Sequence, residues 1–375
     1  MRIAVVGHIC LDLIPHWQVG GLDCLRPGTI VEMNGLAFSP GGVVSNTGLC
    51  LRRLGFDPIL VGRVGSDHLA NIIASIFEQQ GMSPDFLHRS SGTTSYTIVL
   101  SPPGTDRIFL HYPGCNDEFS VDDIDYSALA GSFFHFGYPP LMREMYTEGG
   151  KNLAAVFQKA KDAGCITSLD MAVPDPNAPS GQVDWEEILA RALPYVDVFL
   201  PSLDELLFMV APEEYAALRK GSLRLSTALL DRLGQHLLEL GTAVAGIKLG
   251  SEGFYLCSGA RAGTLFGAQW ANRQLLSPVF QVTARGTTGA GDTTIAGFLA
   301  GLALGQEPCG AATLATAVGA YTVEAAAVEG VPALTEVQAR ISSGWPRGAC
   351  TIAAPGWVPG KLGVLVGPKD GSFLS

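Results

Sequence analysis

The sequence of 375 residues has little charge, and it lacks the patterns of membrane, nucleic-acid-binding and disulfide-rich proteins. Only 16% of the residues are charged, and the net charge of −11 disfavours nucleic acid and anionic membranes as main partners. No apolar run reaches the roughly 18 residues of a membrane span. The eight cysteines form no Cys-x-x-Cys pair and no zinc-like cluster with histidine. We therefore expect a cytoplasmic protein with reduced cysteines.

Motifs of several enzyme classes are also missing. The chain has no Walker A sequence, no Gly-x-Gly-x-x-Gly after its first apolar run, no His-Glu-x-x-His and no Gly-x-Ser-x-Gly. The missing dinucleotide fingerprint counts against a nicotinamide-dependent oxidoreductase.

Short apolar runs alternate with helix-length segments over most of the chain. This alternation predicts an α/β fold with a doubly wound, mostly parallel sheet flanked by helices. The expected strands are residues 3–6, 59–64, 133–136, 165–169, 196–200 and 243–247, and the expected helices are residues 46–54, 67–80, 153–163, 227–240 and 292–304.

Two stretches interrupt this alternation. Residues 13–40 are rich in Gly, Pro and polar residues, with an extended piece expected at 29–33, and residues 92–114 are typical of a hairpin with strands at 96–100 and 107–112. We predict that both stretches pair as a small β-sheet lid. The core would comprise residues 1–12, 41–91 and 115–345, and residues 346–375 would form a Gly/Pro-rich tail with a strand at 364–366 and no readable role.

The most informative motif is Gly-Thr-Thr-Gly-Ala-Gly-Asp at residues 286–292. Apolar residues follow Asp292 at helical spacing, so one face of this helix should be core. A helix N-terminus offers unpaired N–H groups and a positive dipole end, which suit phosphate. The alternative is that Asp292 only caps the helix.

A second constellation lies near the N-terminus. Gly41 and Gly42 precede a helix that carries Asn46, and Asp12 is expected at the carboxyl end of the first strand. Ligands of open α/β sheets bind outside these strand ends, and a carboxylate suits a ligand with several hydroxyl groups. The alternative is a tight turn into a core helix.

Together these motifs resemble those of the ribokinase-like (PfkB) family of carbohydrate and nucleoside kinases, over about residues 1–345. The resemblance is most specific at residues 287–292, and at Gly41-Gly42 with Asn46, followed by residues 51–55. Weaker matches at residues 62–67, 104–107 and 114–116 follow in the expected order.

The resemblance implies a kinase for a small sugar that uses ATP and Mg²⁺. Asp292 would be the catalytic base, kept ionised by the helix N-terminus. The implied anion hole is the backbone of Gly289, Ala290 and Gly291, and the implied sugar-binding residues are Asp12, Gly41, Gly42 and Asn46. The implied nucleotide-side residues are Lys248, Gly250, Gly253, Thr287 and Thr316, and Glu205 would order magnesium-bound water.

Three departures from the family pattern qualify this hypothesis. Gly286 stands where the signature usually has Asp, which counts against an activating potassium ion. Residues 202–205 read Ser-Leu-Asp-Glu where the family has Asn-x-x-Glu. The residues after Asp170 are Met-Ala-Val, which counts against a ketodeoxygluconate or fructose kinase.

Alternatives remain at this point. Phe109, Tyr112 and Tyr138 would stack on the base of a nucleoside substrate, or would simply pack as core of the lid. A sugar-binding regulator without turnover is the other alternative, and an exposed lid edge favours a homodimer through the lid.

Overall fold

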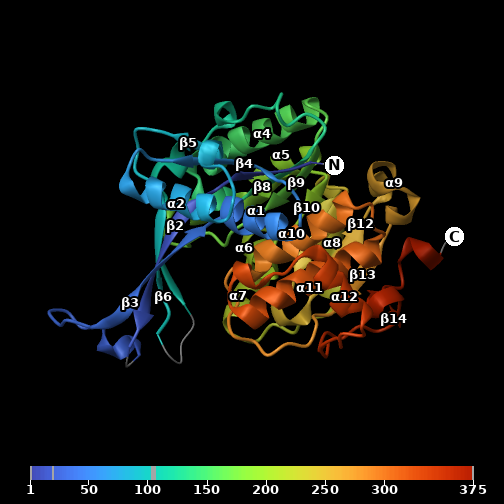
Figure 1. Cartoon of the computed structure of the whole chain (residues 1–375). Helices are drawn as coiled ribbons and strands as arrows, with labels where there is room; N and C mark the ends of the chain where they lie inside the picture. The colour runs from blue at the N-terminus through green and yellow to red at the C-terminus, as the bar shows by residue number, and fades with distance from the viewer. Residues whose placement is uncertain (1, 19–20, 103–106, 374–375) are drawn as a thin grey trace.

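The computed structural model describes residues 2–18, 21–102 and 107–373. Within these residues an eleven-stranded sheet forms the centre of the molecule, in the order β14-β15-β13-β12-β11-β10-β9-β8-β1-β4-β5 (Figure 1). The strands from β5 across to β11 are parallel, and the rest are antiparallel. They are β1 (Ile3–Gly7), β4 (Ile59–Val64), β5 (Leu87–Arg89), β8 (Phe133–Gly137), β9 (Ile166–Asp170), β10 (Val198–Phe199), β11 (Val244–Lys248), β12 (Phe254–Ser258), β13 (Gln274–Ser277), β14 (Val358–Pro359) and β15 (Leu365–Val366).

Helices cover both faces of the main sheet, and each face has its own hydrophobic core. Side chains alternate along β1, so that Ile3 and Val5 enter one core while Ala4 and Val6 enter the other. The first core packs under α1 (Val43–Arg53), α2 (His68–Gln79), α9 (Ala260–Phe266), α10 (Ala290–Ala303), α11 (Pro308–Ala325) and α12 (Leu334–Ser342). The second packs under α3 (Arg143–Tyr146), α4 (Lys151–Asp162), α5 (Trp185–Ala192), α6 (Leu203–Val210), α7 (Pro212–Arg219) and α8 (Thr227–Glu239). None of the described helices is long and apolar enough to cross a membrane.

The predicted doubly wound fold is confirmed, with each expected strand and helix present and its ends shifted by up to three residues. The first predicted helix begins at Val43 rather than Asn46, because Gly42, with a φ of 84°, ends the extended chain there. The helix α10 is buried on more than its predicted apolar face, since it packs against both α1 and α11. The antiparallel strands β12 and β13 were not expected from the sequence.

A separate four-stranded sheet extends from the body of the molecule, at the lower left of Figure 1. Its order is β3-β2-β6-β7, with β2 (Cys10–Trp17), β3 (Met33–Gly41), β6 (Tyr96–Leu100) and β7 (Ile108–Tyr112). The predicted hairpin is confirmed, since β6 and β7 pair antiparallel. Of the extended piece expected at 29–33, only Met33 belongs to a strand, because pairing with β2 begins there. Residues 103–106, which include most of the weak motif at 104–107, lie outside the described residues.

The C-terminal tail is folded onto the main body. The strand expected at 364–366 is confirmed as β15, which pairs with β13 and extends the sheet. Asp370 binds Arg273 at 3.0 Å, and Thr351 donates to Glu252 in the turn after β11. The tail therefore completes one end of the sheet.

Candidate active site

Polar side chains from distant parts of the chain meet at the carboxyl ends of the central parallel strands. Tyr138 follows β8, Asp170 ends β9 and Lys248 ends β11. Lys248 binds Asp170 at 2.5 Å, and Tyr138 binds Asp292 at the start of α10. In open α/β folds this edge of the sheet is where ligands bind.

Asp292 lies in the first turn of α10 with 3% of its surface exposed. Its carboxylate accepts hydrogen bonds from Asn46 Nδ2 at 2.9 Å and from the Tyr138 hydroxyl at 2.9 and 2.8 Å. The residue at the N-cap is Gly289, and no side chain caps this helix. The alternative in which Asp292 merely caps its helix is therefore wrong.

The environment of Asp292 makes its carboxylate a stronger base than an exposed aspartate. Burial raises the pKa of Asp292 above its ordinary value, while the charge of Lys248 and the donors Asn46 and Tyr138 oppose that rise. The helix N-terminus was expected to keep this carboxyl ionised, but burial acts in the opposite direction on its pKa. A pKa shifted toward neutral pH is favourable for a general base.

The turn before α10 leaves several backbone donors without a partner among the described residues. Within the described residues, the N–H groups of Gly289, Gly291 and Asp292 have no acceptor, whereas the N–H of Ala290 donates to the carbonyl of Thr287 at 3.2 Å. Gly289 adopts a φ of 72°, which glycine tolerates without strain. A Cβ on the exposed Gly291 would lie 3.8 Å from Lys248 Nζ. These N–H donors form a candidate phosphate cradle, and the ammonium group of Lys248 lies beside it.

Lys248 is the buried cation of the site, and carboxylates surround it. Its Nζ is 2.5 Å from Asp170 and 3.9 Å from Glu205. Burial alone would lower the pKa of Lys248, but Asp170, Glu205 and Asp292 raise it. Burial also raises the pKa of Asp170 well above its usual range, although Lys248 acts against this. Lys248 therefore stays protonated beside the phosphate cradle.

Glu205 has a structural role of its own in α6. It forms a capping box with Ser202, because the Ser202 N–H donates to Glu205 Oε2 at 2.6 Å and the Glu205 N–H donates to Ser202 Oγ. The described residues contain no group of three or more His, Cys, Asp or Glu side chains placed to hold a metal ion. Glu205 thus lies beside Lys248 as a single carboxylate that could order magnesium-bound water.

Asp12 reaches the site from the small sheet. It lies on β2, so the placement at the end of the first strand is wrong: the chain turns at Gly7, with a φ of 125°, and starts a new strand at Cys10. A Cβ on Gly41 would lie 2.6 Å from both carboxylate oxygens of Asp12, so glycine is needed there. Gly42 packs as closely against the backbone of His8. Burial, above all, raises the pKa of Asp12 to about 6.

The four remaining residues predicted on the nucleotide side come from three separate segments of the chain. Thr287 accepts a hydrogen bond at 2.8 Å from Arg107, the residue directly before β7. Gly250 and Gly253 form the turn after β11, where Gly253 packs against the carbonyl of Ser277. Thr316 is buried, and its hydroxyl accepts a hydrogen bond from Arg347 of the tail at 2.9 Å. The tail therefore covers one of the predicted nucleotide contacts.

The three aromatic residues considered for base stacking do not form one platform. Phe109 and Tyr112 alternate along β7, so they lie on opposite faces of the small sheet, and both are exposed rather than packed as core. Tyr138 packs its ring on His8, with centroids 5.9 Å apart. Tyr138 was expected only as a base-stacking or lid-core residue, and its contact with Asp292 and the place of Asp170 beside Lys248 were not predicted. The sequence signal that could have indicated both residues is their position at the end of a buried strand.

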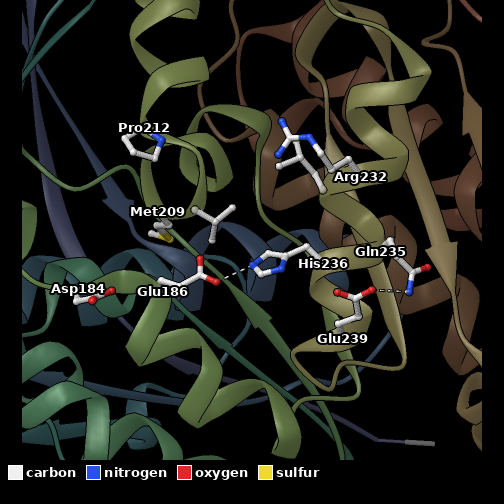
Figure 2. Close-up of a pocket in the computed structure, with 10 residues that line it drawn as sticks. Asp184, Glu186, Met209, Pro212, Arg232, Gln235, His236 and Glu239 are labelled. Atoms are coloured by element: carbon white, nitrogen blue, oxygen red, sulfur yellow. Dashed lines mark hydrogen bonds and ion pairs between the residues drawn. The ribbon is translucent and has the colours of Figure 1, made fainter.

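An open pocket lies elsewhere on the described surface. It has a volume of about 680 Å³ and lies between α5, α6 and α8 (Figure 2). Glu186 and His236 pair across it at 2.7 Å, and Gln235 pairs with Glu239. None of the predicted site residues lines this pocket.

Comparison with known sequences identifies the family. A profile described as pfkB family carbohydrate kinase matches residues 1–333. This chain belongs to that family. The kinase is 29% identical over 286 residues to a protein of Archaeoglobus fulgidus named as an uncharacterized sugar kinase, covering 75% of this chain and 98% of the relative. It is 24% identical over 302 residues to a fructokinase of Vibrio alginolyticus, covering 80% and 83%.

Solved structures confirm the fold of this carbohydrate kinase. A ribokinase of Arabidopsis thaliana, solved with ribose and ATP, superposes with a TM-score of 0.70 at 19% identity, covering 90% of this chain and 97% of the other. The predicted ribokinase-like fold with a small lid-like sheet is therefore confirmed, and the chain is a sugar kinase of a family that uses ATP.

Proposed function

We propose that the protein transfers the γ-phosphoryl group of ATP to a hydroxyl of a small, unphosphorylated sugar, with Asp292 as the base. The observation that carries this proposal is the buried Asp292 carboxylate beside the open N–H donors of the α10 turn. One site then holds both a proton acceptor and an anion cradle, which is what phosphoryl transfer to an alcohol requires.

In this mechanism, Asp292 accepts the proton of the attacking sugar hydroxyl. The backbone N–H groups at Gly289 and Gly291 and the ammonium group of Lys248 stabilise the charge on the transferring phosphoryl group, since such transition states depend on positioning and electrostatics. Ala290 holds the turn through its bond to Thr287. Asp12 and Asn46 bind sugar hydroxyls, with Gly41 and Gly42 giving them room, and residues 13–40 and 92–114 act as a lid that excludes water.

ATP and magnesium fit the residues that surround the cradle. Lys248, the α10 N–H donors and Thr287 would hold the phosphates, and the Gly250–Gly253 turn would lie beside the nucleotide. Magnesium would be held by phosphate oxygens and water, with Glu205 ordering one such water, since Mg²⁺ commonly keeps several waters. Bound magnesium neutralises charge on the donor phosphates. A potassium site is not part of the proposal, because Gly286 stands where the family signature usually has an aspartate.

The proposal is tested by incubating the protein with ATP, Mg²⁺ and a panel of sugars and nucleosides, and measuring ADP release. We expect release that depends on an unphosphorylated sugar. Turnover with adenosine or another nucleoside, and none with sugars, would favour the nucleoside kinase alternative. A sugar that raises the melting temperature but never stimulates ADP release would instead indicate a sugar-binding regulator.

The pH dependence of sugar binding should report on Asp12. Because the pKa of Asp12 is raised to about 6, its carboxylate is ionised above that pH and becomes protonated below it. A protonated carboxyl loses acceptor capacity for sugar hydroxyls. We expect the KM for the sugar to rise as the pH falls through about 6, while the KM for ATP stays flat. In Asp12→Asn, the sugar KM should be high and independent of pH over this range.

Gly41→Ala should weaken sugar binding without harming the fold. The new Cβ would lie 2.6 Å from both Asp12 oxygens, so the Asp12 side chain must rotate away. Loss of one hydrogen bond to a charged group costs about 1.5–3 kcal/mol, which corresponds to a roughly 10- to 100-fold higher sugar KM. Gly259→Ala is the matched control, because a Cβ there meets nothing within 4 Å. An unchanged sugar KM in Gly41→Ala would argue against Asp12 as a sugar ligand.

A homodimer through the small sheet is also part of the proposal. Leu36 and Phe38 on β3 and Leu110 on β7 are exposed, with 50%, 45% and 50% of their surfaces accessible. Contiguous apolar side chains on a sheet face favour association.

A further inference from the structure

We propose that Tyr138 is a positioning residue, which fixes the orientation of the Asp292 carboxylate for proton transfer by donating its hydroxyl to both carboxylate oxygens. The inference rests on the proposed role of Asp292 as the base. It concerns a residue outside both motifs that carry the family resemblance.

The hydrogen-bond geometry around Asp292 selects the ionised carboxylate. The Tyr138 hydroxyl is 2.9 Å from Oδ1 and 2.8 Å from Oδ2, so it lies nearly midway between the two oxygens. Asn46 Nδ2, which can only donate, is 2.9 Å from Oδ2. An ionised carboxylate only accepts and has about four acceptor positions, so both donors are satisfied and room remains for a substrate hydroxyl.

The chain holds Tyr138 in place through an unusual backbone conformation. Tyr138 has a φ of 66° and a ψ of 41°, the left-handed region that bulky residues rarely adopt. Its N–H donates to the carbonyl of Asp170 at 3.4 Å, and its carbonyl accepts from the N–H of Leu141 at 3.0 Å. The ring packs against buried His8, whose pKa burial lowers well below its ordinary value. Such strain persists where the surroundings dictate it, and it concentrates at functional sites.

Loss of the Tyr138 hydroxyl should make Asp292 harder to ionise. Burial raises the pKa of Asp292, and the Tyr138 hydrogen bond is one of the contacts that lower it, so its removal leaves burial less opposed. The other titratable groups that act on or respond to Asp292 come from five elements, and they are Cys10 and Asp12 of β2, Cys50 of α1, Asp170 of β9, Glu205 of α6 and Lys248 of β11. Tyr138→Phe leaves all of them in place.

The test compares the pH profiles of kcat for wild type, Tyr138→Phe and Tyr255→Phe. Tyr255 is the matched control, because it is buried and its hydroxyl donates to Asp231 at 2.9 Å outside the site. We expect Tyr138→Phe to lower kcat at neutral pH about tenfold, to move the acid limb to higher pH and to recover activity at alkaline pH. Tyr255→Phe should keep the wild-type profile. Superimposable profiles for all three proteins would overturn the inference.

Two further outcomes separate this inference from the proposed function. If Asp292→Asn turns over normally, the proposed function itself fails. If Asp292→Asn is inactive and Tyr138→Phe keeps the wild-type pH profile, only the role of Tyr138 fails. Should Tyr138→Phe not fold, fluorotyrosine at position 138 keeps the ring shape and is a stronger donor. It should move the acid limb to lower pH, and an unmoved limb would overturn the inference.

Discussion

Asp292→Asn is expected to lower kcat by about 10²- to 10⁴-fold, the range that a positioned general base contributes. Asparagine keeps the shape of the side chain, so Asn46 and Tyr138 can still bind it, but the amide cannot accept the proton of a sugar hydroxyl. The free energy of unfolding should not fall. Because burial raises the pKa of Asp292, ionising this carboxyl costs more in the folded protein than in the unfolded chain, and a neutral amide avoids that cost.

This prediction is checked by kcat together with urea unfolding at neutral pH. Asp231→Asn is the control, since Asp231 also accepts a hydrogen bond from a buried tyrosine hydroxyl, that of Tyr255. The control should retain full activity. A wild-type kcat in Asp292→Asn would contradict the mechanism, whereas a large loss of stability would show that the carboxylate is needed for folding.

Lys248→Met should damage both activity and stability. Activity should fall about 10²- to 10³-fold, as when one preorganised donor to a developing anion is removed. Stability should fall by up to about 3–5 kcal/mol, because Asp170 and Glu205 lose their buried cation. Burial raises the pKa of Asp170, so this carboxyl can take up a proton when Lys248 is absent, which reduces the loss of stability. The loss should therefore be larger at higher pH, where Asp170 ionises.

The double variant Lys248→Met/Asp170→Asn separates the two effects. Removing the carboxylate together with its partner should restore most of the stability in urea unfolding, but none of the activity. Restored activity in the double variant would mean that Lys248 serves the fold alone and not the phosphate.

The two glycine motifs could be recognised in the sequence because each is a local pattern. Residues 287–292 predict a turn, a helix and a carboxylate within a few positions, and the contact between Asn46 and Asp292 agrees with the two motifs forming one site. Tyr138 and Asp170 carry no such pattern. Each is a single residue after a buried strand, and only the order β11-β10-β9-β8-β1 brings them to Lys248 and Asp292.

Other elements could not be predicted from the sequence for different physical reasons. The strand β3 was not predicted over 33–41 because its extent depends on pairing with β2, a contact with another segment of the chain, and not on local composition. Asp12 belongs to the small sheet because β1 ends at Gly7 and a new strand begins at Cys10, a break that apolar patterning does not reveal. The tail has weak apolar periodicity, yet it is ordered by partners such as Arg273 and Thr316 far away in the sequence.

The tail also affects which edge strands of the protein could pair with a strand of another molecule. At one end of the main sheet β14 is two residues long and contains Pro359, which has no N–H to offer, and at the other end β5 is three residues long with exposed His88 and Arg89. Short, charged or proline-bearing edges resist pairing with foreign strands. The nine-residue β3 is longer, carries no charged residue, and has its only proline, Pro40, next to its C-terminal end. Any fibrillar or domain-swapped assembly of this kinase should therefore grow from the small sheet and leave the main sheet intact.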